Sequence, residues 1–221
     1  MNFDEHSADY SREVDQALAV AGLPHDFFFE AKVRHILEAR RRLPDSEVRV
    51  LELGCGVGLL QQRLRPLLPH VWGIDPSIAS LAAAPERRGI AADGLALPFA
   101  DESFHLVIAV CVLHHVPPEH RAAFLAEATR VTRKNGIVTL CEHNPWNPLT
   151  RLVVNRCEFD RDAVLLPLAE SKRRLAAAGL GQIRSRYIHF FPWRGALWQG
   201  LERRLAPLPL GGQYVVDATR V

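Results

Sequence analysis

The sequence lacks a large excess of charge of either sign, because 27 Lys and Arg residues stand against 25 Asp and Glu residues among 221. Nucleic-acid-binding proteins usually carry a clear basic excess. The chain also lacks an apolar run long enough to cross a bilayer, and its first residues lack the basic start and apolar core of a secretion signal. We therefore expect a soluble, cytoplasmic protein with no nucleic-acid partner and no membrane partner.

Cysteine is scarce, and no pair has the Cys-x-x-Cys spacing typical of redox or zinc sites. The four residues are Cys55, Cys111, Cys141 and Cys157. Most of them fall in or beside apolar segments that predict buried strands, so free thiols in a reducing compartment fit best. No metal-ligand spacing stands out among the histidines either. We therefore predict no metal ion and no disulfide.

Internal repeats, low-complexity tracts and flexible linkers are absent as well. A chain of this length suits one domain with a sizeable core. We divide the single domain 1–221 into a helical cap or lid over 1–44, a cofactor-binding half over 45–142 and a substrate-side half over 143–221. Apolar segments that predict strands alternate with helical patterns as far as about residue 140, which indicates a parallel sheet with crossing helices.

The stretch 50–58, Val-Leu-Glu-Leu-Gly-Cys-Gly-Val-Gly, is the most informative part of the chain. An apolar strand passes directly into closely spaced glycines, which let the backbone turn sharply and approach a ligand. The apolar periodicity that follows opens a helix whose N-terminus faces the turn. This arrangement predicts a nucleotide-like cofactor.

The details of this turn argue against a nicotinamide dinucleotide. The dinucleotide fingerprint Gly-x-Gly-x-x-Gly needs a glycine where Leu59 stands. Glu52, near the end of the strand, would repel a pyrophosphate and attract a cationic ligand such as a sulfonium or an ammonium. The Tyr-x-x-x-Lys pair of many reductases is also absent. An NAD(P)-dependent reductase is therefore the weaker alternative.

The stretch 50–58 resembles motif I of the class I S-adenosylmethionine-dependent methyltransferases. Two later segments match the same family in order, Gly73-Ile74-Asp75-Pro76-Ser77 and Asp93-Gly94 followed by Leu97-Pro98-Phe99. The resemblance implies a cofactor site in which Asp75 binds the ribose and Asp93 the adenine amino group. Its predicted residues are Glu52, Gly54, Cys55, Gly56, Asp75, Pro76, Asp93, Gly94 and Cys111.

The match around Asp75 also has a plain structural alternative. Asp75 could begin a turn, and Ser77 could cap the next helix. His105 stands where the family usually has an Asp that supports the end of the sheet, a change that leaves the cofactor site largely unaffected. The fold implied by the resemblance is a Rossmann-like three-layer α/β sandwich, with a seven-stranded, mostly parallel sheet, an antiparallel last strand and an N-terminal helical cap.

Polar residues follow two further predicted strands, at the sheet edge where ligands bind in such folds. The predicted substrate-binding residues are Tyr10, His114, His115, Glu142, His143 and Asn144. His143 is the first candidate for a general base and His115 the second. His114 and His115 could instead only pack their loop, and Asn147 could simply cap a helix.

The two ends of the chain complete the expected fold. Tyr10 and the aromatic run 27–29 could form a lid over the cofactor and the acceptor. Towards the other end, we predict helices over 161–168, 170–178 and 193–205 and strands over 183–191 and 213–219.

The resemblance implies transfer of the methyl group of S-adenosylmethionine, with S-adenosylhomocysteine as the product. We expect the acceptor to be an oxygen or nitrogen atom of a small molecule, a specialised metabolite or a glycan-related intermediate. A non-catalytic protein that keeps the cofactor for a structural or regulatory role is the alternative from another class. The sequence leaves open whether the protein is a monomer or a homodimer.

Overall fold

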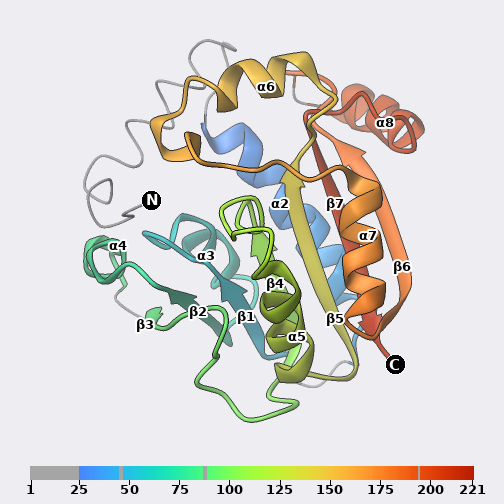
Figure 1. Cartoon of the computed structure of the whole chain (residues 1–221). Helices are drawn as coiled ribbons and strands as arrows, with labels where there is room; N and C mark the ends of the chain where they lie inside the picture. Colours follow the sequence, from blue (N-terminus) through green and yellow to red (C-terminus); the bar gives the residue numbers. More distant parts are fainter. Residues whose placement is uncertain (1–24, 45–46, 87–88, 194) are drawn as a thin grey trace.

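The computed structural model describes residues 25–44, 47–86, 89–193 and 195–221. It contains one seven-stranded sheet in the order β3-β2-β1-β4-β5-β7-β6 (Figure 1). The strands are β1 Val50–Leu53, β2 Val71–Asp75, β3 Gly89–Ala91, β4 Phe104–Val110, β5 Thr132–His143, β6 Leu180–Ile188 and β7 Gln213–Arg220. β7 is antiparallel to both of its neighbours, whereas the pairs from β3 to β5 are parallel. The predicted sheet is confirmed, including its antiparallel last strand.

Helices cover both faces of this sheet and complete the predicted three-layer sandwich. The helices are α2 His25–Arg40, α3 Leu59–Leu64, α4 Ile78–Ala83, α5 Arg121–Val131, α6 Pro148–Val154, α7 Leu168–Ala177 and α8 Ala196–Leu205. Side chains of α5 and α7 pack on one face of the sheet and those of α2 and α3 on the other, because alternate strand residues point to opposite faces. Leu51 and Leu53 face α5, while Val50 faces α2 and α3.

Three local predictions need correction. The predicted helix over 161–168 is absent: a turn at 161–162 and a stretch without regular structure over 163–167 lead from the 3₁₀ turn η2 (Glu158–Asp160) to α7. Leu166 is fully buried there, and Val164 donates its amide hydrogen to the carbonyl oxygen of His114, so tertiary contacts override the local helical pattern. β6 begins three residues earlier than expected and ends earlier as well, and α8 begins three residues later.

The N-terminal cap is described only in part. α2 lies within the predicted helical cap and ends at Arg40. Tyr10 and the rest of 1–24 lie outside the described residues, so the lid stays a prediction. No described helix is both long enough and apolar enough to cross a membrane.

Candidate active site

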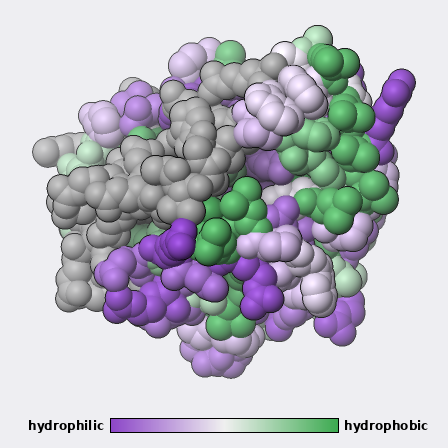
Figure 2. Space-filling model, turned by 90° about the horizontal axis from the view of Figure 1, so that it is seen from above, coloured by the Kyte–Doolittle hydropathy of each residue, from purple (hydrophilic) through white to green (hydrophobic). Residues whose placement is uncertain are grey.

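The carboxyl ends of the parallel strands border one cavity of about 480 Å³. This volume lies in the usual range for pockets that bind small molecules. All the predicted cofactor residues line it, together with His115 and His143. The cofactor half of its wall consists of Glu52, Gly54, Cys55, Gly56, Asp75, Pro76, Asp93, Gly94 and Cys111. The face of the molecule that contains these strand ends is seen in Figure 2.

The glycine turn is built for close backbone approach. Gly54 and Gly56 have φ angles of 68° and 51°, in the left-handed region that side chains other than glycine rarely adopt. A Cβ on Gly54 would lie 2.6 Å from a methyl group of Val112, whereas Gly56 has open space where its Cβ would stand. Gly54 therefore makes room for the neighbouring loop, and Gly56 presents bare backbone to the cavity.

Asp75 ties the end of β2 to this turn. Its Oδ2 accepts the amide hydrogen of Gly56 at 2.7 Å, and its Oδ1 accepts that of Ser77 at 2.9 Å. The Ser77 side chain also caps α4, as the structural alternative proposed, by accepting from Ser80 N. Asp75 therefore has a structural role, whether or not it also binds the ribose.

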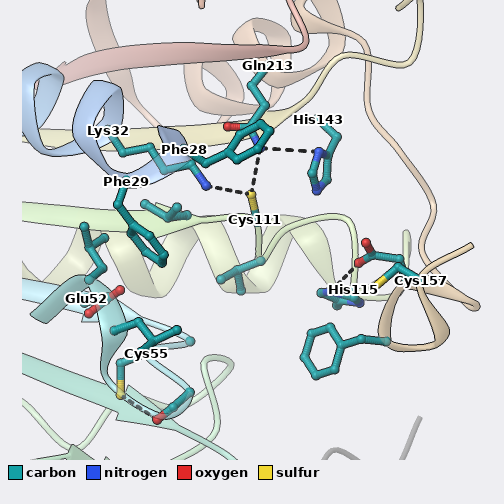
Figure 3. Close-up of a pocket in the computed structure, with 18 of the residues that line it drawn as sticks. Phe28, Phe29, Lys32, Glu52, Cys55, Cys111, His115, His143, Cys157 and Gln213 are labelled. Atoms are coloured by element: carbon teal, nitrogen blue, oxygen red, sulfur yellow. Dashed lines mark hydrogen bonds and ion pairs between the residues drawn. The ribbon is translucent and has the colours of Figure 1, made fainter. Parts of the chain in front are cut away.

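Glu52 lies at the bottom of the cavity with 4% of its surface exposed (Figure 3). Its Oε2 is buried without a hydrogen bond among the described residues. Burial raises the pKa of Glu52 to about 8, helped by the charge of Asp75 and opposed by Gln61 and Arg65. A positively charged ligand group would stabilise the ionised form of such a buried, unpaired carboxyl group.

Asp93 and Gly94 follow β3 at the edge of the cavity. Asp93 is exposed, and its Oδ1 accepts the amide hydrogen of Leu95 at 2.9 Å. A Cβ on Gly94 would lie 2.6 Å from the ring of Phe124, so this glycine lets the loop pack against α5. The Asp93 carboxylate remains at the cavity wall, where it can accept a further hydrogen bond.

The acceptor half of the cavity has aromatic walls. His143, at the end of β5, lies with Nδ1 3.4 Å from Nε2 of Gln213, the first residue of β7. Figure 3 shows both side chains beside Cys111, which follows β4. The cavity is lined by the rings of Phe28, Phe159, Phe190 and Phe191, whereas Phe29 lies beside Glu52 on the cofactor side (Figure 3).

Cys111 belongs to the cofactor wall and also borders the acceptor half, beside His143 and Gln213. Its φ of 57° is left-handed, and its Sγ accepts hydrogen bonds from Lys32 Nζ at 3.6 Å and Gln213 Nε2 at 3.5 Å. These contacts are not indicated by the local sequence around Cys111. Lys32 comes from α2, and nothing in its local pattern indicates a partner so far along the chain.

His114, Glu142 and Asn144 do not line the cavity, which corrects their predicted role as substrate ligands. His114 and Glu142 are each 1% exposed, and Nδ1 of His114 lies 2.5 Å from Oε2 of Glu142. Asn144 is fully buried, and its amide donates to the carbonyl oxygens of Pro209 and Gly211. These side chains hold the loops behind the cavity wall. His115 and His143 do face the cavity.

Comparisons with known proteins agree with this arrangement. Residues 51–140 match the model of a methyltransferase domain. A demethylmenaquinone methyltransferase of Beutenbergia cavernae is 34% identical over 169 residues, 74% of this chain and 66% of that protein. A ubiquinone biosynthesis O-methyltransferase of Azorhizobium caulinodans is 28% identical over 188 residues, 76% of this chain and 73% of that protein. Several other curated relatives are matched over only about half of their length.

Solved structures show the same fold. A possible histamine N-methyltransferase of Thermotoga maritima, described as S-adenosylmethionine-dependent, superposes with a TM-score of 0.72 at 21% identity, covering 99% of this chain and 98% of that one. A methyltransferase of Archaeoglobus fulgidus with the same cofactor dependence gives 0.61 at 17% identity, covering 89% and 100%. With the glycine turn, Glu52 and the two acids on one cavity, the chain belongs to the class I S-adenosylmethionine-dependent methyltransferases.

Proposed function

We propose that the protein transfers the methyl group of S-adenosylmethionine to an oxygen atom of a small aromatic acceptor of the hydroquinone class. The observation that carries this proposal is the cavity lining, in which several phenylalanine rings share the wall with His143. Flat apolar acceptors suit such walls better than glycans, which need many polar partners. The names of the relatives, demethylmenaquinone and ubiquinone biosynthesis methyltransferases, support the same class.

Exposed apolar side chains add to this argument. Trp146, Leu149 and Leu152 lie on or next to α6, and Leu197 and Leu201 lie on α8. Both helices stand at the end of the molecule that Figure 2 views, where apolar surface gathers on one side of the face. Such a surface suits the apolar part of an acceptor that extends beyond the cavity.

The chemistry needs little more than orientation and a base. A sulfonium is already a strong electrophile, so holding the acceptor oxygen in line with the methyl group contributes most, about 7–11 kcal/mol. In this proposal His143 takes the proton of the hydroxyl group, which would accelerate the reaction roughly 10²–10⁴-fold. Nε2 of Gln213 lies 3.4 Å from Nδ1, and the amide has to turn its oxygen towards Nδ1–H for Nε2 of the ring to take this proton. His115, on the same wall, is the second candidate.

The proposal is tested with S-adenosylmethionine labelled in its methyl group. The purified protein is incubated with small hydroquinones and, separately, with their dimethyl ethers, and products are followed by mass spectrometry. We expect a gain of one methyl group with the free hydroquinones only. Methylation of the ethers, which have no free hydroxyl group, would show that the acceptor atom is a carbon. Binding of S-adenosylmethionine and S-adenosylhomocysteine by calorimetry, without transfer to any acceptor of this class, would contradict the proposal.

The role of His143 is tested by His143→Ala, with His120→Ala as the matched control. His120 is an exposed histidine just before α5 and lies outside the cavity. His143→Ala should lower turnover at least 10²-fold while cofactor affinity stays unchanged. His120→Ala should keep the turnover and the cofactor affinity of the wild type. Normal turnover of His143→Ala would make His143 a purely structural residue.

A further inference from the structure

Three potential metal ligands converge beside the acceptor half of the cavity. Nε2 of His114 and Nε2 of His115 lie 3.4 Å and 3.3 Å from the same oxygen, Oδ1 of Asp160. One ligand atom from each residue lies within 4.8 Å of the other two. The two histidines follow β4, while Asp160 ends the 3₁₀ turn η2. Figure 3 shows His115 on the cavity wall with a dashed contact to a carboxylate.

The spacing of these atoms suits a tetrahedral ion. Imidazole nitrogens and carboxylate oxygens bind zinc at 2.0–2.2 Å, so two ligand atoms of a zinc tetrahedron stand about 3.3 Å apart. The two distances from Oδ1 of Asp160 are 3.4 Å and 3.3 Å. An ion placed between the three groups therefore requires little movement of the aspartate relative to either ring.

His114 is already oriented as a ligand. Its Nδ1 lies 2.5 Å from Oε2 of Glu142, whose other oxygen accepts the amide hydrogens of Val112 and Leu113. A carboxylate that holds the far nitrogen of an imidazole is the usual support of a metal-binding histidine. The near nitrogen, Nε2, is buried and makes no hydrogen bond among the described residues. It points towards Asp160.

The charge of this cluster also favours a cation. The carboxylates of Glu142 and Asp160 both lie against His114, with one oxygen of each at 2.5 Å and 3.4 Å from its ring nitrogens. A divalent ion held between the two rings and Asp160 would balance this concentration of carboxylate oxygens.

We propose that His114, His115 and Asp160 form a binding site for a divalent ion of the zinc class. His115 and Asp160 line the cavity, so the remaining coordination position opens towards the acceptor half, where water or an oxygen of a bound molecule would occupy it. His143 lies on the same side, with its ring 5.1 Å from that of His114. This site revises the sequence prediction of no metal, which considered only the spacing of the histidines. The site is independent of which acceptor is methylated.

The test is direct titration of the chelator-treated full-length protein with Zn²⁺ by calorimetry and with Co²⁺ by absorption spectroscopy. We expect one ion per chain and a tetrahedral cobalt spectrum without a thiolate-to-cobalt band. His115→Ala and Asp160→Asn should each weaken binding at least tenfold. Glu142→Gln, which removes the support of His114, should weaken it roughly 10–100-fold.

Two control variants locate the ion. His120→Ala should bind it as the wild type does, since this histidine is exposed and outside the cluster. Cys111→Ser should also keep the ion, because Cys111 belongs to the neighbouring group around Lys32. Binding of S-adenosylhomocysteine confirms that each variant is folded. Absence of binding in the wild type, unchanged affinity in His115→Ala and Asp160→Asn, or loss of the ion in Cys111→Ser would each overturn the proposal.

Discussion

Nζ of Lys32 lies 3.6 Å from Sγ of Cys111, although the two residues are 79 positions apart. Lys32 is 8% exposed, so its ammonium group needs a nearby negative charge. Burial disfavours the thiolate of Cys111, but the charges of Lys32 and His143 outweigh it and lower the pKa of Cys111 to about 7. The pKa values of Cys55, Cys141 and Cys157 are raised instead by burial.

Cys111 should therefore react with iodoacetamide much faster at neutral pH than the other cysteines do. Lys32→Met should raise the pH midpoint of this reaction above about 7, because it removes a cation that stabilises the thiolate. Mass spectrometry of the alkylated protein over a range of pH measures the midpoint. Lys134→Met, at an exposed position of β5, is the matched control and should leave it unchanged. An identical midpoint in Lys32→Met would show that this ion pair does not control the thiol.

Asp75→Ala and Asp93→Ala separate two contributions to cofactor binding. Asp75 holds Gly56 and Ser77, so its loss should reduce both cofactor affinity and the free energy of unfolding, each by about 1–3 kcal/mol. Asp93 is exposed, so Asp93→Ala should reduce affinity while the free energy of unfolding changes by less than about 0.5 kcal/mol. Calorimetric titration and urea unfolding measure the two quantities. Wild-type cofactor affinity in either variant would contradict its assignment.

The cofactor half was predictable because its signals are local. The apolar run of β1, the glycines of the turn and the acid that ends β2 lie close together in the chain, and strand alternation fixes their place at one sheet edge. Confirmed local details include the capping of α6 by Asn147. The fold from residue 50 to residue 143 therefore follows largely from periodicity.

The acceptor half depends on contacts that no local pattern encodes. The segment 161–167 has helical periodicity but forms no helix, because Arg121 donates to the carbonyl oxygen of Val164 and Leu166 is buried. Asn144 looks like a site residue in the sequence, yet its amide holds a distant loop. Asp160, just before this irregular segment, lies beside His114 and His115 because of long-range packing and not because of any local sequence pattern. Tertiary packing decided each of these positions.

Glu52→Gln should lower the affinity for the cofactor and make the cofactor-free protein more stable at neutral pH. Because the folded pKa of about 8 exceeds the ordinary value of 4.5, the native protein keeps a proton between these pH values that the unfolded chain releases. The free energy of unfolding of the cofactor-free wild type should therefore fall between pH 5 and pH 8, and fall less in Glu52→Gln. The variant should also bind S-adenosylmethionine more weakly, since the negative charge is gone. Parallel pH profiles of urea unfolding would contradict this account of Glu52.

Asp217 on β7 anchors α2, the helix that carries Lys32, to the sheet. Its Oδ1 lies 2.9 Å from Nε2 of His35 and accepts from the hydroxyl of Thr139 at 2.8 Å, and Arg42 reaches its Oδ2 at 2.5 Å. Burial opposes ionisation, but these partners lower the pKa of Asp217. A lowered pKa contributes stability that is present at neutral pH and is lost as the pH falls through the folded pKa.

Asp217→Asn should therefore cost about 3–5 kcal/mol of unfolding free energy at pH 7, because it leaves a buried network without its central charge. This difference should shrink in acid, where the wild-type carboxyl group also becomes neutral. Glu38→Gln is the matched control, because Glu38 is 42% exposed where it pairs with Arg186. This variant should change the free energy of unfolding by no more than about 1 kcal/mol. Urea unfolding at pH 7 and at several pH values below 3.8, the ordinary pKa of the Asp217 carboxyl group, gives both values. If Asp217 holds α2 in place, its loss should also raise the pH midpoint of Cys111 alkylation, because Lys32 moves with the helix; an unchanged midpoint would show that α2 is held by its apolar face alone.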